Sequence, residues 1–146
     1  MKKCASAKKN NNYIFEVSII EQKDQNQLIR KINKGIFPFK TNDQKLPKLM
    51  KKHIGKNLSC STDINRYYNA DVIVSCISFD CNSSKKSFKE NSTEYLKSLK
   101  IIAERMRPET LLIIQSTLPP GFTNLFIKPL FEKEFKKRDI SSKNLL

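Results

Sequence analysis

The strongest hydrophobic signals in the chain are two short apolar runs without alternation. Residues Leu111–Ile114 are four consecutive apolar side chains, and Val72–Val74 is a similar run. Such runs are typical of strands buried on both faces of a parallel sheet, whereas a strand with one solvated face alternates apolar and polar residues. We therefore predict strands at Ala70–Ser78 and Thr110–Gln115, each covered on both faces.

Two further strands are expected nearer the amino terminus. Tyr13–Ile20 is rich in β-branched and aromatic residues and ends at Glu21, and Asn57–Thr62 is a briefer segment of the same kind. These segments and the two apolar runs are predicted to form one mainly parallel sheet.

Helical periodicity appears between the strands, where apolar side chains recur three and four positions apart. Helices are predicted at Gln25–Lys34, Pro47–Ile54 and Tyr95–Met106, with another after Gly121. Pro129 restricts the start of that last helix, because proline lacks an amide hydrogen and its ring clashes with the preceding turn. Thr123 offers a side-chain oxygen to cap it. Strands alternating with helices predict an α/β fold with right-handed parallel crossovers.

Length and composition narrow the class of protein. The 146 residues suit one domain, for which we expect the range 13–146, after a polar tail at residues 1–12 that has little to bury and is expected to be disordered. No apolar run approaches the ~20 residues that span a bilayer, and no apolar segment follows Lys2 and Lys3 as in a signal peptide. A cytoplasmic protein without a membrane partner is the expectation.

The net charge of +14 raises the question of nucleic-acid binding. Of the 28 basic residues 23 are lysines, and they are spread along the chain. Sequence-specific readers of nucleic acids use arginine forks and stacked aromatic side chains beside basic residues, and no such cluster is present. A solvated basic surface is the favoured interpretation, with nonspecific adsorption at low salt.

The four cysteines do not predict a metal site. Cys4, Cys60, Cys76 and Cys81 contain no Cys-x-x-Cys pair, and the single histidine, His53, lies in a lysine-rich segment. Cys60 and Cys76 fall in predicted strands and are expected to be small buried side chains, whereas Cys81 falls in a predicted loop.

Polar residues follow the predicted strands where each strand ends. Glu21, Ser78 and the pair Ser116–Thr117 would then lie at the same edge of a parallel sheet, which is where doubly wound sheets bind their ligands. A carboxylate at this position suits the ribose hydroxyls of NAD. The alternative for Glu21 is an exposed strand-end charge.

Two segments carry a resemblance to a known family. They read Ala-Asp-Val-Ile-Val-Ser-Cys-Ile-Ser (70–78) and Leu-Leu-Ile-Ile-Gln-Ser-Thr-Leu-Pro-Pro-Gly-Phe-Thr (111–123). Together they resemble the UDP-glucose/GDP-mannose dehydrogenase family, most closely its UDP-N-acetyl-D-mannosamine dehydrogenase branch. The segment Ile32-Asn33-Lys34-Gly35 also matches the family, and the match runs from about Val17 to Leu146.

The resemblance implies an oxidoreductase that uses NAD to convert the C6 alcohol of a nucleotide sugar to a carboxylate, as in the synthesis of polysaccharide precursors. It implies a homo-oligomeric parent enzyme, and the dispersed lysines described above predict no specific nucleic-acid partner. Thr117 would lie near the nicotinamide and support catalysis through its hydroxyl. Backbone at Ile77, Ser78 and Phe79 would line the NAD site, together with Ser116 and with Glu21 at the ribose.

The chain also departs from the family pattern. The family begins with a glycine-rich strand–turn–helix that holds the pyrophosphate, but the three glycines here are Gly35, Gly55 and Gly121, and none precedes Tyr13. The spacing from Glu21 to Gly35 is longer than in the family, and Phe79 replaces a frequent Thr. The catalytic Lys, Asn and Cys of the family lie beyond the matched segments.

We therefore expect a partial Rossmann-like domain without its first βα unit, an internal piece of a dehydrogenase that is inactive alone. Two alternatives remain open. One is a non-catalytic Rossmann-like binding or subunit-interaction module, and the other is a basic protein that binds nucleic acids nonspecifically.

Overall fold

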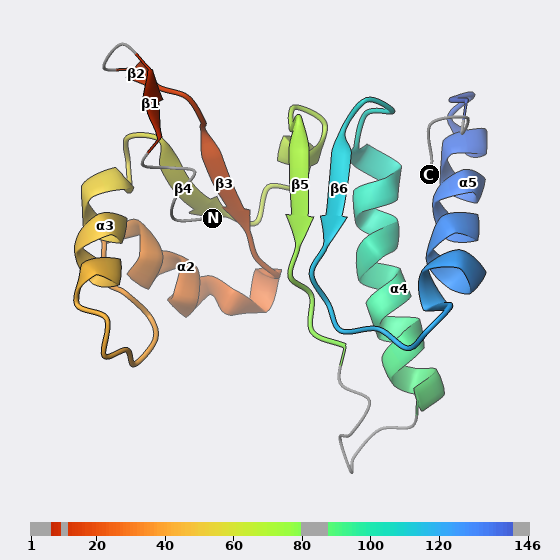
Figure 1. Ribbon diagram of the computed structural model, residues 1–146, viewed down its shortest axis with the longest axis horizontal. Coiled ribbons are helices and arrows are strands. Elements are labelled where there is room, and N and C mark those ends of the chain that lie inside the picture. Colours follow the sequence, from red (N-terminus) through yellow and green to blue (C-terminus); the bar gives the residue numbers. More distant parts are fainter. Residues whose placement is uncertain (1–6, 10–11, 80–87, 142–146) are drawn as a thin grey trace. The chain divides into compact units, whose positions relative to one another are not determined.

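The computed structural model describes residues 7–9, 12–79 and 88–141, with the side chains of 88–91 left aside. The chain forms two compact units, Met1–Asp63 and Ile64–Leu146. Figure 1 shows the elements of each unit in chain order.

The first unit is built on a short parallel strand pair. Strand β3 (Val17–Ile20) pairs in parallel with β4 (Leu58–Ser61), so that Val17 lies opposite Leu58 and Ile20 opposite Ser61. Between these strands the chain forms a 3-10 turn at Lys23–Gln25 and the helices α2 (Asn26–Asn33) and α3 (Lys45–His53). The buried side chains of Ile32, Met50, Leu58 and Cys60 form its core.

The Ile32-Asn33-Lys34-Gly35 segment connects α2 to β4, and this connection explains its residue types. The Asn33 side chain donates from Nδ2 to the Cys60 carbonyl at 2.8 Å and accepts the Cys60 N–H at Oδ1 at 3.1 Å. Gly35 has φ 74°, and the bonds from Gly35 N to Ile32 O and from Ile36 N to Lys31 O close a Schellman motif. The segment therefore ends the helix and fixes it to the strand.

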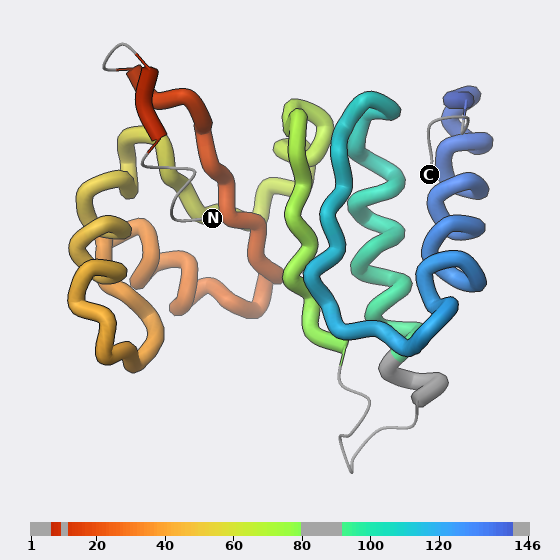
Figure 2. Tube along the Cα trace, viewed as in Figure 1, coloured from red at the N-terminus to blue at the C-terminus, as the bar shows by residue number. Residues whose placement is uncertain are grey.

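The second unit contains the two strands with apolar runs. Strand β5 (Val72–Ser75) pairs in parallel with β6 (Leu111–Ile114), with Val72 opposite Leu111 and Ser75 opposite Ile114. Its other elements are a 3-10 turn (Ile64–Tyr67), α4 (Phe88–Arg105), a π-helix (Thr123–Ile127) and α5 (Lys128–Lys137). In Figure 2 the chain passes from β6 through a long turn into the π-helix and α5.

The core of the second unit lies between one face of its sheet and the two long helices. Ile73, Leu112 and Ile114 face a cluster of buried side chains from α4, the π-helix and α5. The buried members from these helices are Tyr95, Leu99, Ile102, Ala103, Ile127, Phe131 and Phe135. Arg138 closes the packing, because its guanidinium donates to the Ala103 and Met106 carbonyls at the end of α4, at 2.9 and 2.8 Å.

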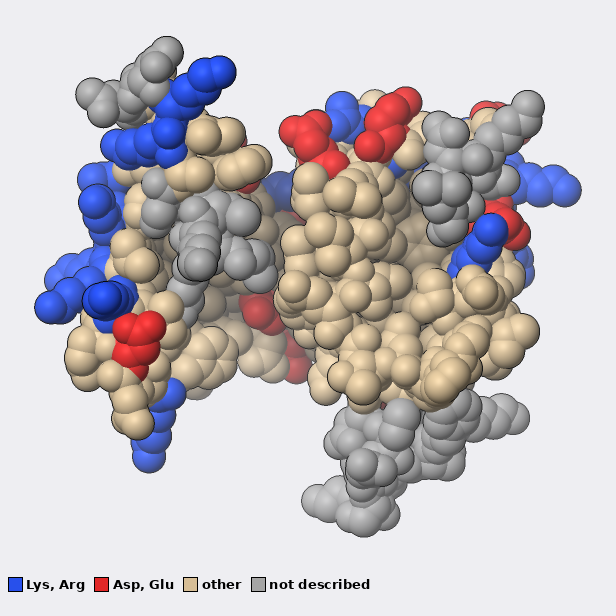
Figure 3. Space-filling view, in the orientation of Figure 1, with Lys and Arg blue, Asp and Glu red and all other residues tan. Residues whose placement is uncertain are grey.

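The prediction that both apolar strands are covered on two faces is wrong within this unit. Val72, Leu111 and Ile113 are 50%, 57% and 39% exposed, because α4 and α5 pack against the opposite face. The β5–β6 side of the unit is correspondingly almost free of charged side chains in Figure 3.

The predicted parallel pairing is confirmed, but a single sheet is not seen. The four predicted strands form two separate two-stranded sheets, β3 with β4 and β5 with β6. Parallel neighbouring strands joined by helical connections, as in each of these pairs, are also the building units of doubly wound sheets.

Several element boundaries differ from the prediction. The segment expected to be disordered contains β1 (Lys8–Lys9), which pairs antiparallel with β2 (Asn12–Tyr13). Helix α4 begins at Phe88 rather than Tyr95. Thr123 makes no side-chain cap, because the helical turn already starts at Phe122.

The helix after Gly121 shows the expected effect of Pro129. Proline lies in the first turn of α5, and the preceding turn has π geometry, in which Lys128 N donates to Thr123 O. The wider turn changes which side chains face the core. Leu125 and Phe126 are 70% and 45% exposed, whereas Phe122 and Ile127 are buried.

We predict that Asn33→Ala lowers the free energy of unfolding by about 1–3 kcal/mol, because it leaves both backbone groups of Cys60 without their side-chain partner. Urea denaturation and amide exchange at Cys60 measure the effect. Asn26→Ala, an exposed asparagine at the start of the same helix, is the matched control. Equal stability of the two variants would contradict this role of Asn33.

Candidate functional site

The expected site residues are divided between the two units. Glu21 lies at the carboxyl end of β3, where its N–H donates to the Ser61 carbonyl at 3.0 Å and extends the strand pairing by one residue. The side chain is half-buried. Its carboxylate is close enough to Cys60 to affect that thiol. Burial, with a smaller contribution from Glu21, raises the pKa of Cys60 to about 11.

The other five expected residues come together in the second unit. The parallel register of β5 and β6 places Ile77, Ser78 and Phe79 beside Ser116 and Thr117, since both segments continue from the carboxyl ends of paired strands. The Ser116 hydroxyl donates to the Ile77 carbonyl at 2.6 Å and joins the two segments directly. The sequence-based prediction that these strand ends meet is therefore confirmed in this unit.

The three hydroxyl residues at this edge have different environments. Ser78 and Thr117 are exposed, and neither hydroxyl has a partner among the described residues. Ser116 is half-buried and uses its hydroxyl inside the protein. Besides donating to Ile77, it accepts a hydrogen bond from the Tyr95 hydroxyl at 3.1 Å. Among the described residues of this edge, only Ser78 and Thr117 thus have hydroxyl groups without a partner.

Tyr95 is a residue of this edge that the sequence analysis placed only in a helix. Its ring is 2% exposed, and burial raises its pKa above the ordinary value of 10.0 although the Ser116 hydrogen bond opposes the change. The phenol therefore remains a donor at neutral pH. A tyrosine at the helical spacing of Leu99 and Ile102 was the available signal, since a buried tyrosine hydroxyl usually finds a partner.

An aromatic cluster supports these strand ends. The Phe79 ring lies 5.2 Å from Tyr95 and 5.1 Å from Phe122, between ring centroids, and Phe122 lies 4.8 Å from Phe126. Phe79 therefore contributes its side chain to packing, which leaves its backbone as the part that can face a ligand. Phe122 was also missed by the sequence analysis.

The turn after Thr117 is fixed by its prolines and glycine. Phe122 N donates to Pro119 O at 3.1 Å, and Gly121 has φ 80°. A type II turn requires a positive φ at its third position, which glycine supplies, and it commonly has proline at the second. The turn redirects the chain from the strand end into the π-helix, so that Thr117 stays at the exposed edge.

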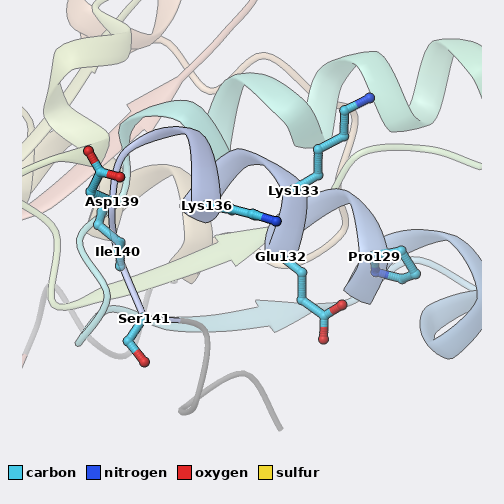
Figure 4. A pocket seen from close by; sticks show the side chains of 7 residues that line it. All are labelled: Pro129, Glu132, Lys133, Lys136, Asp139, Ile140 and Ser141. Atoms are coloured by element: carbon cyan, nitrogen blue, oxygen red, sulfur yellow. The ribbon is translucent and has the colours of Figure 1, made fainter.

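A surface hollow of ≈ 950 Å³ lies elsewhere, along α5. It is lined by Pro129, Glu132, Lys133, Lys136, Asp139, Ile140 and Ser141. Figure 4 shows that the Glu132 and Lys133 side chains point away from each other rather than toward one point. None of the expected site residues lines this hollow.

Within the described residues no group of three or more His, Cys, Asp or Glu side chains could hold a metal ion. No helix of the described part of the chain is long and apolar enough to cross a bilayer. Of the cysteines, Cys60 is buried as expected, but Cys76 is exposed and donates to Gln115 Oε1 at 3.3 Å. Cys76 is exposed because side chains alternate along a strand, which places it on the same uncovered face as Val72. Cys4 and Cys81 lie outside the described residues.

The comparisons with known proteins agree with this geometry. A sequence model described as the UDP-glucose/GDP-mannose dehydrogenase family, NAD binding domain, matches residues 6–145. The chain belongs to this family. NAD, the cofactor expected from the sequence, is therefore confirmed as the cofactor of the domain. No curated protein matches the chain.

Two solved structures share the fold. The NDP-N-acetyl-D-galactosaminuronic acid dehydrogenase of Methanosarcina mazei Go1 is 21% identical with a TM-score of 0.66, and the match covers 81% of this chain and 25% of that one. The GDP-mannose dehydrogenase of Pseudomonas aeruginosa, solved as a ternary complex, is 18% identical with a TM-score of 0.67, and the match covers 90% and 28%. The chain spans about a quarter of the length of these dehydrogenases.

The described residues fit one part of an NAD site. The hydroxyl groups of Ser78 and Thr117 and the backbone of Ile77–Phe79 lie at one edge, where they offer hydrogen-bond donors and acceptors. The pyrophosphate normally requires a glycine-rich turn at a helix amino end. All three glycines serve other turns, since Gly35 and Gly55 follow helix ends and Gly121 completes the type II turn. The features of the family that this chain shares are therefore the residues at the carboxyl ends of the strands, not a glycine-rich turn.

We predict that Cys60 resists alkylation near pH 8 while Cys76 reacts. A thiol with a pKa of about 11 instead of about 9 has about 100-fold less thiolate at this pH, and burial slows attack further. Peptide-resolved mass spectrometry after iodoacetamide treatment measures both sites. Comparable rates at Cys60 and Cys76 in the folded protein would contradict the prediction.

The same pKa shift predicts a pH dependence of stability. A pKa raised by folding contributes stability that is fully present below the unfolded value of 9.0 and is lost as pH rises through about 11. Cys60→Ala should remove this contribution to the fall in unfolding free energy between these values, and Cys76→Ala, the matched control, should not. Identical pH profiles of the two variants would contradict the assignment.

Proposed function

We propose that this chain is the strand-end part of the cofactor site of an NAD-dependent nucleotide-sugar 6-dehydrogenase. In this reaction the C6 alcohol of a UDP-sugar is oxidised to a uronate in two steps, and each step transfers a hydride to NAD. The observation that supports the proposal most directly is that Ser78 and Thr117, both with free hydroxyls, lie on the adjacent segments that follow the carboxyl ends of β5 and β6.

Each expected residue has a role in the proposed site. Thr117 assists at the nicotinamide and the reacting sugar carbon through its hydroxyl, which can donate or accept a hydrogen bond. The backbone of Ile77–Phe79 lines the nicotinamide riboside, and Ser116 contributes from inside by holding Ile77. Glu21 is proposed to accept hydrogen bonds from a ribose at the carboxyl end of β3.

We further propose that the chain alone binds NAD weakly and does not oxidise a sugar. Hydride transfer requires the dinucleotide to be held to within about an ångström of its productive position. Ser78 and Thr117 can contact one end of it, but all three glycines of the chain are committed to other turns. The parent enzyme is proposed to be a cytoplasmic homo-oligomer in polysaccharide precursor synthesis, with UDP-N-acetyl-D-mannosamine as the first substrate to test.

One observation favours a second candidate function, a non-catalytic interaction module. The uncovered face of the β5–β6 sheet exposes Val72, Leu111 and Ile113 side by side, and apolar patches of this kind suit burial against another protein segment. A module of this kind would keep the fold of the second unit without contacting NAD.

Titration of the full chain with NAD, followed by backbone NMR, separates the two candidates. We expect a Kd weaker than about 1 mM, with shifts concentrated at Ser78 and Thr117, and no NADH formation with UDP-N-acetyl-D-mannosamine or UDP-glucose. Thr117→Ala should reduce the shifts, and Thr117→Ser, which keeps the hydroxyl, should retain them. No shift at these residues at saturating NAD would favour the interaction module, and micromolar affinity or turnover that Thr117→Ala abolishes would show a more complete site.

The basic surface supports only nonspecific binding of nucleic acids. Lys45, Lys48, Lys51 and Lys52 are all exposed on α3, where they can contact phosphates but offer no bidentate fork for base edges. Binding to DNA or RNA is therefore predicted to be independent of sequence and largely lost between 50 mM and 200 mM salt, the range over which phosphate contacts weaken steeply. Fluorescence anisotropy with several unrelated oligonucleotides tests this, and a preference for one sequence at physiological salt would contradict it.

A further inference from the structure

The hydroxyl groups of Tyr95 and Ser116 meet behind the exposed edge of β5 and β6. Tyr95 O–H donates to Ser116 Oγ at 3.1 Å, and Ser116 O–H donates to the Ile77 carbonyl at 2.6 Å. These two hydrogen bonds, called the relay below, connect α4 to the end of β6 and the end of β6 to the end of β5. It thus links three segments that are far apart in the sequence and that meet only in the folded unit.

The relay determines the direction of the Ser78 N–H, which belongs to the same peptide group as the Ile77 carbonyl. The Ile77 carbonyl and the Ser78 N–H belong to one peptide group, which is planar, and the chain contains no cis peptide bond among the described residues. In a trans peptide these two groups point in opposite directions. Because the carbonyl is held by Ser116, the Ser78 N–H must point away from Ser116.

The Ser78 N–H has no partner among the described residues, and the Ser78 side chain is exposed. An unpaired amide of this kind is a ready donor for an oxygen atom of a ligand. Fixing its direction before binding lowers the entropic cost of binding, because the peptide does not have to be ordered by the ligand.

We propose that Tyr95 and Ser116 are positioning residues that hold the Ser78 amide as a preorganised donor for the nicotinamide riboside of NAD. The identity of the ligand rests on the function proposed above, whereas the orientation of the Ile77–Ser78 peptide does not. Neither Tyr95 nor Ser116 contacts the ligand through its hydroxyl. Their effect reaches it through the Ile77–Ser78 peptide.

The surroundings explain why the relay can act as a rigid support. Tyr95 is enclosed by Phe79 and Phe122, so its ring has little freedom to move the hydroxyl away from Ser116. Ser75, the last residue of β5, differs from Ser116 in this respect. Its hydroxyl is buried and has no hydrogen-bond partner, so it supports no other group.

The first measurement is the NMR order parameter of the Ser78 amide in the full chain. We expect about 0.85 in the wild type and a fall toward about 0.6 in Ser116→Ala, with a smaller fall in Tyr95→Phe. Ser116→Thr keeps the hydroxyl and should restore the wild-type value. Ser75→Ala, which removes the same atom from the same region without touching the relay, should leave Ser78 unchanged.

The second measurement is the NAD titration of the same variants. Ser116→Ala should weaken NAD binding about threefold to tenfold, the effect of one hydrogen bond, and Ser116→Thr should recover it. A purely structural role of Ser116 would lower stability without a change confined to Ser78 and without this rescue.

The outcomes separate the two proposals. An order parameter at Ser78 that is equal in Ser116→Ala and Ser75→Ala overturns the positioning role, whether or not NAD binds. If Ser116→Ala changes the order parameter locally at Ser78 but the wild-type protein shows no NAD-dependent shifts, the relay is supported and its assignment to NAD is overturned. A local change with unchanged NAD affinity overturns the role of the Ser78 amide as a ligand donor.

Discussion

The parallel pairing of β5 with β6 is the constraint on which the candidate site depends. The register that sets Val72 opposite Leu111 also brings Ile77 beside Ser116, and these two residues then form a hydrogen bond across 39 positions of sequence. A slip of one residue would turn every side chain of a strand to the opposite face, which would separate the hydroxyl from the carbonyl. The same slip would place Ile73 on the uncovered face. Packing against α4 and the geometry of the site therefore stabilise the same register.

Neighbouring polar residues at the edge of the second unit differ in burial. Ser116 lies against α4, where Tyr95 and Ile77 satisfy its hydroxyl, and the neighbouring Thr117 is exposed with its hydroxyl free. A half-buried hydroxyl is stabilised only if it finds partners inside the protein, whereas an exposed one exchanges partners with water at little cost. Two adjacent residues thus differ in their surroundings, since Ser116 supports the strand ends and Thr117 keeps its hydroxyl at the surface.

In the first unit the resemblance to the dehydrogenase family has a structural explanation. Gly35 adopts a left-handed conformation to end α2, and Asn33 joins the last turn of that helix to both backbone groups of Cys60. A β-carbon at Gly35 would lie 3.3 Å from the Lys51 side chain, so glycine also permits the close approach of α3. The segment is needed for the packing of β4, and it explains a family match without a direct contact to a ligand.

The sequence by itself determined the strands, the alternation with helices and the positions of the turns. These follow from local chemistry, because apolar runs, helical spacing and residues such as Gly121 act within a few positions. Only the tertiary structure decided which faces are covered and which hydroxyls are free. Leu125 and Phe126 are exposed because a π turn before Pro129 changes the face presented to the core, and Cys76 is exposed because it lies on the uncovered face of the β5–β6 sheet. The role of Tyr95 likewise depends on a partner 21 residues away. Burial and hydrogen bonding at these positions depend on contacts between distant segments, which local patterns do not encode.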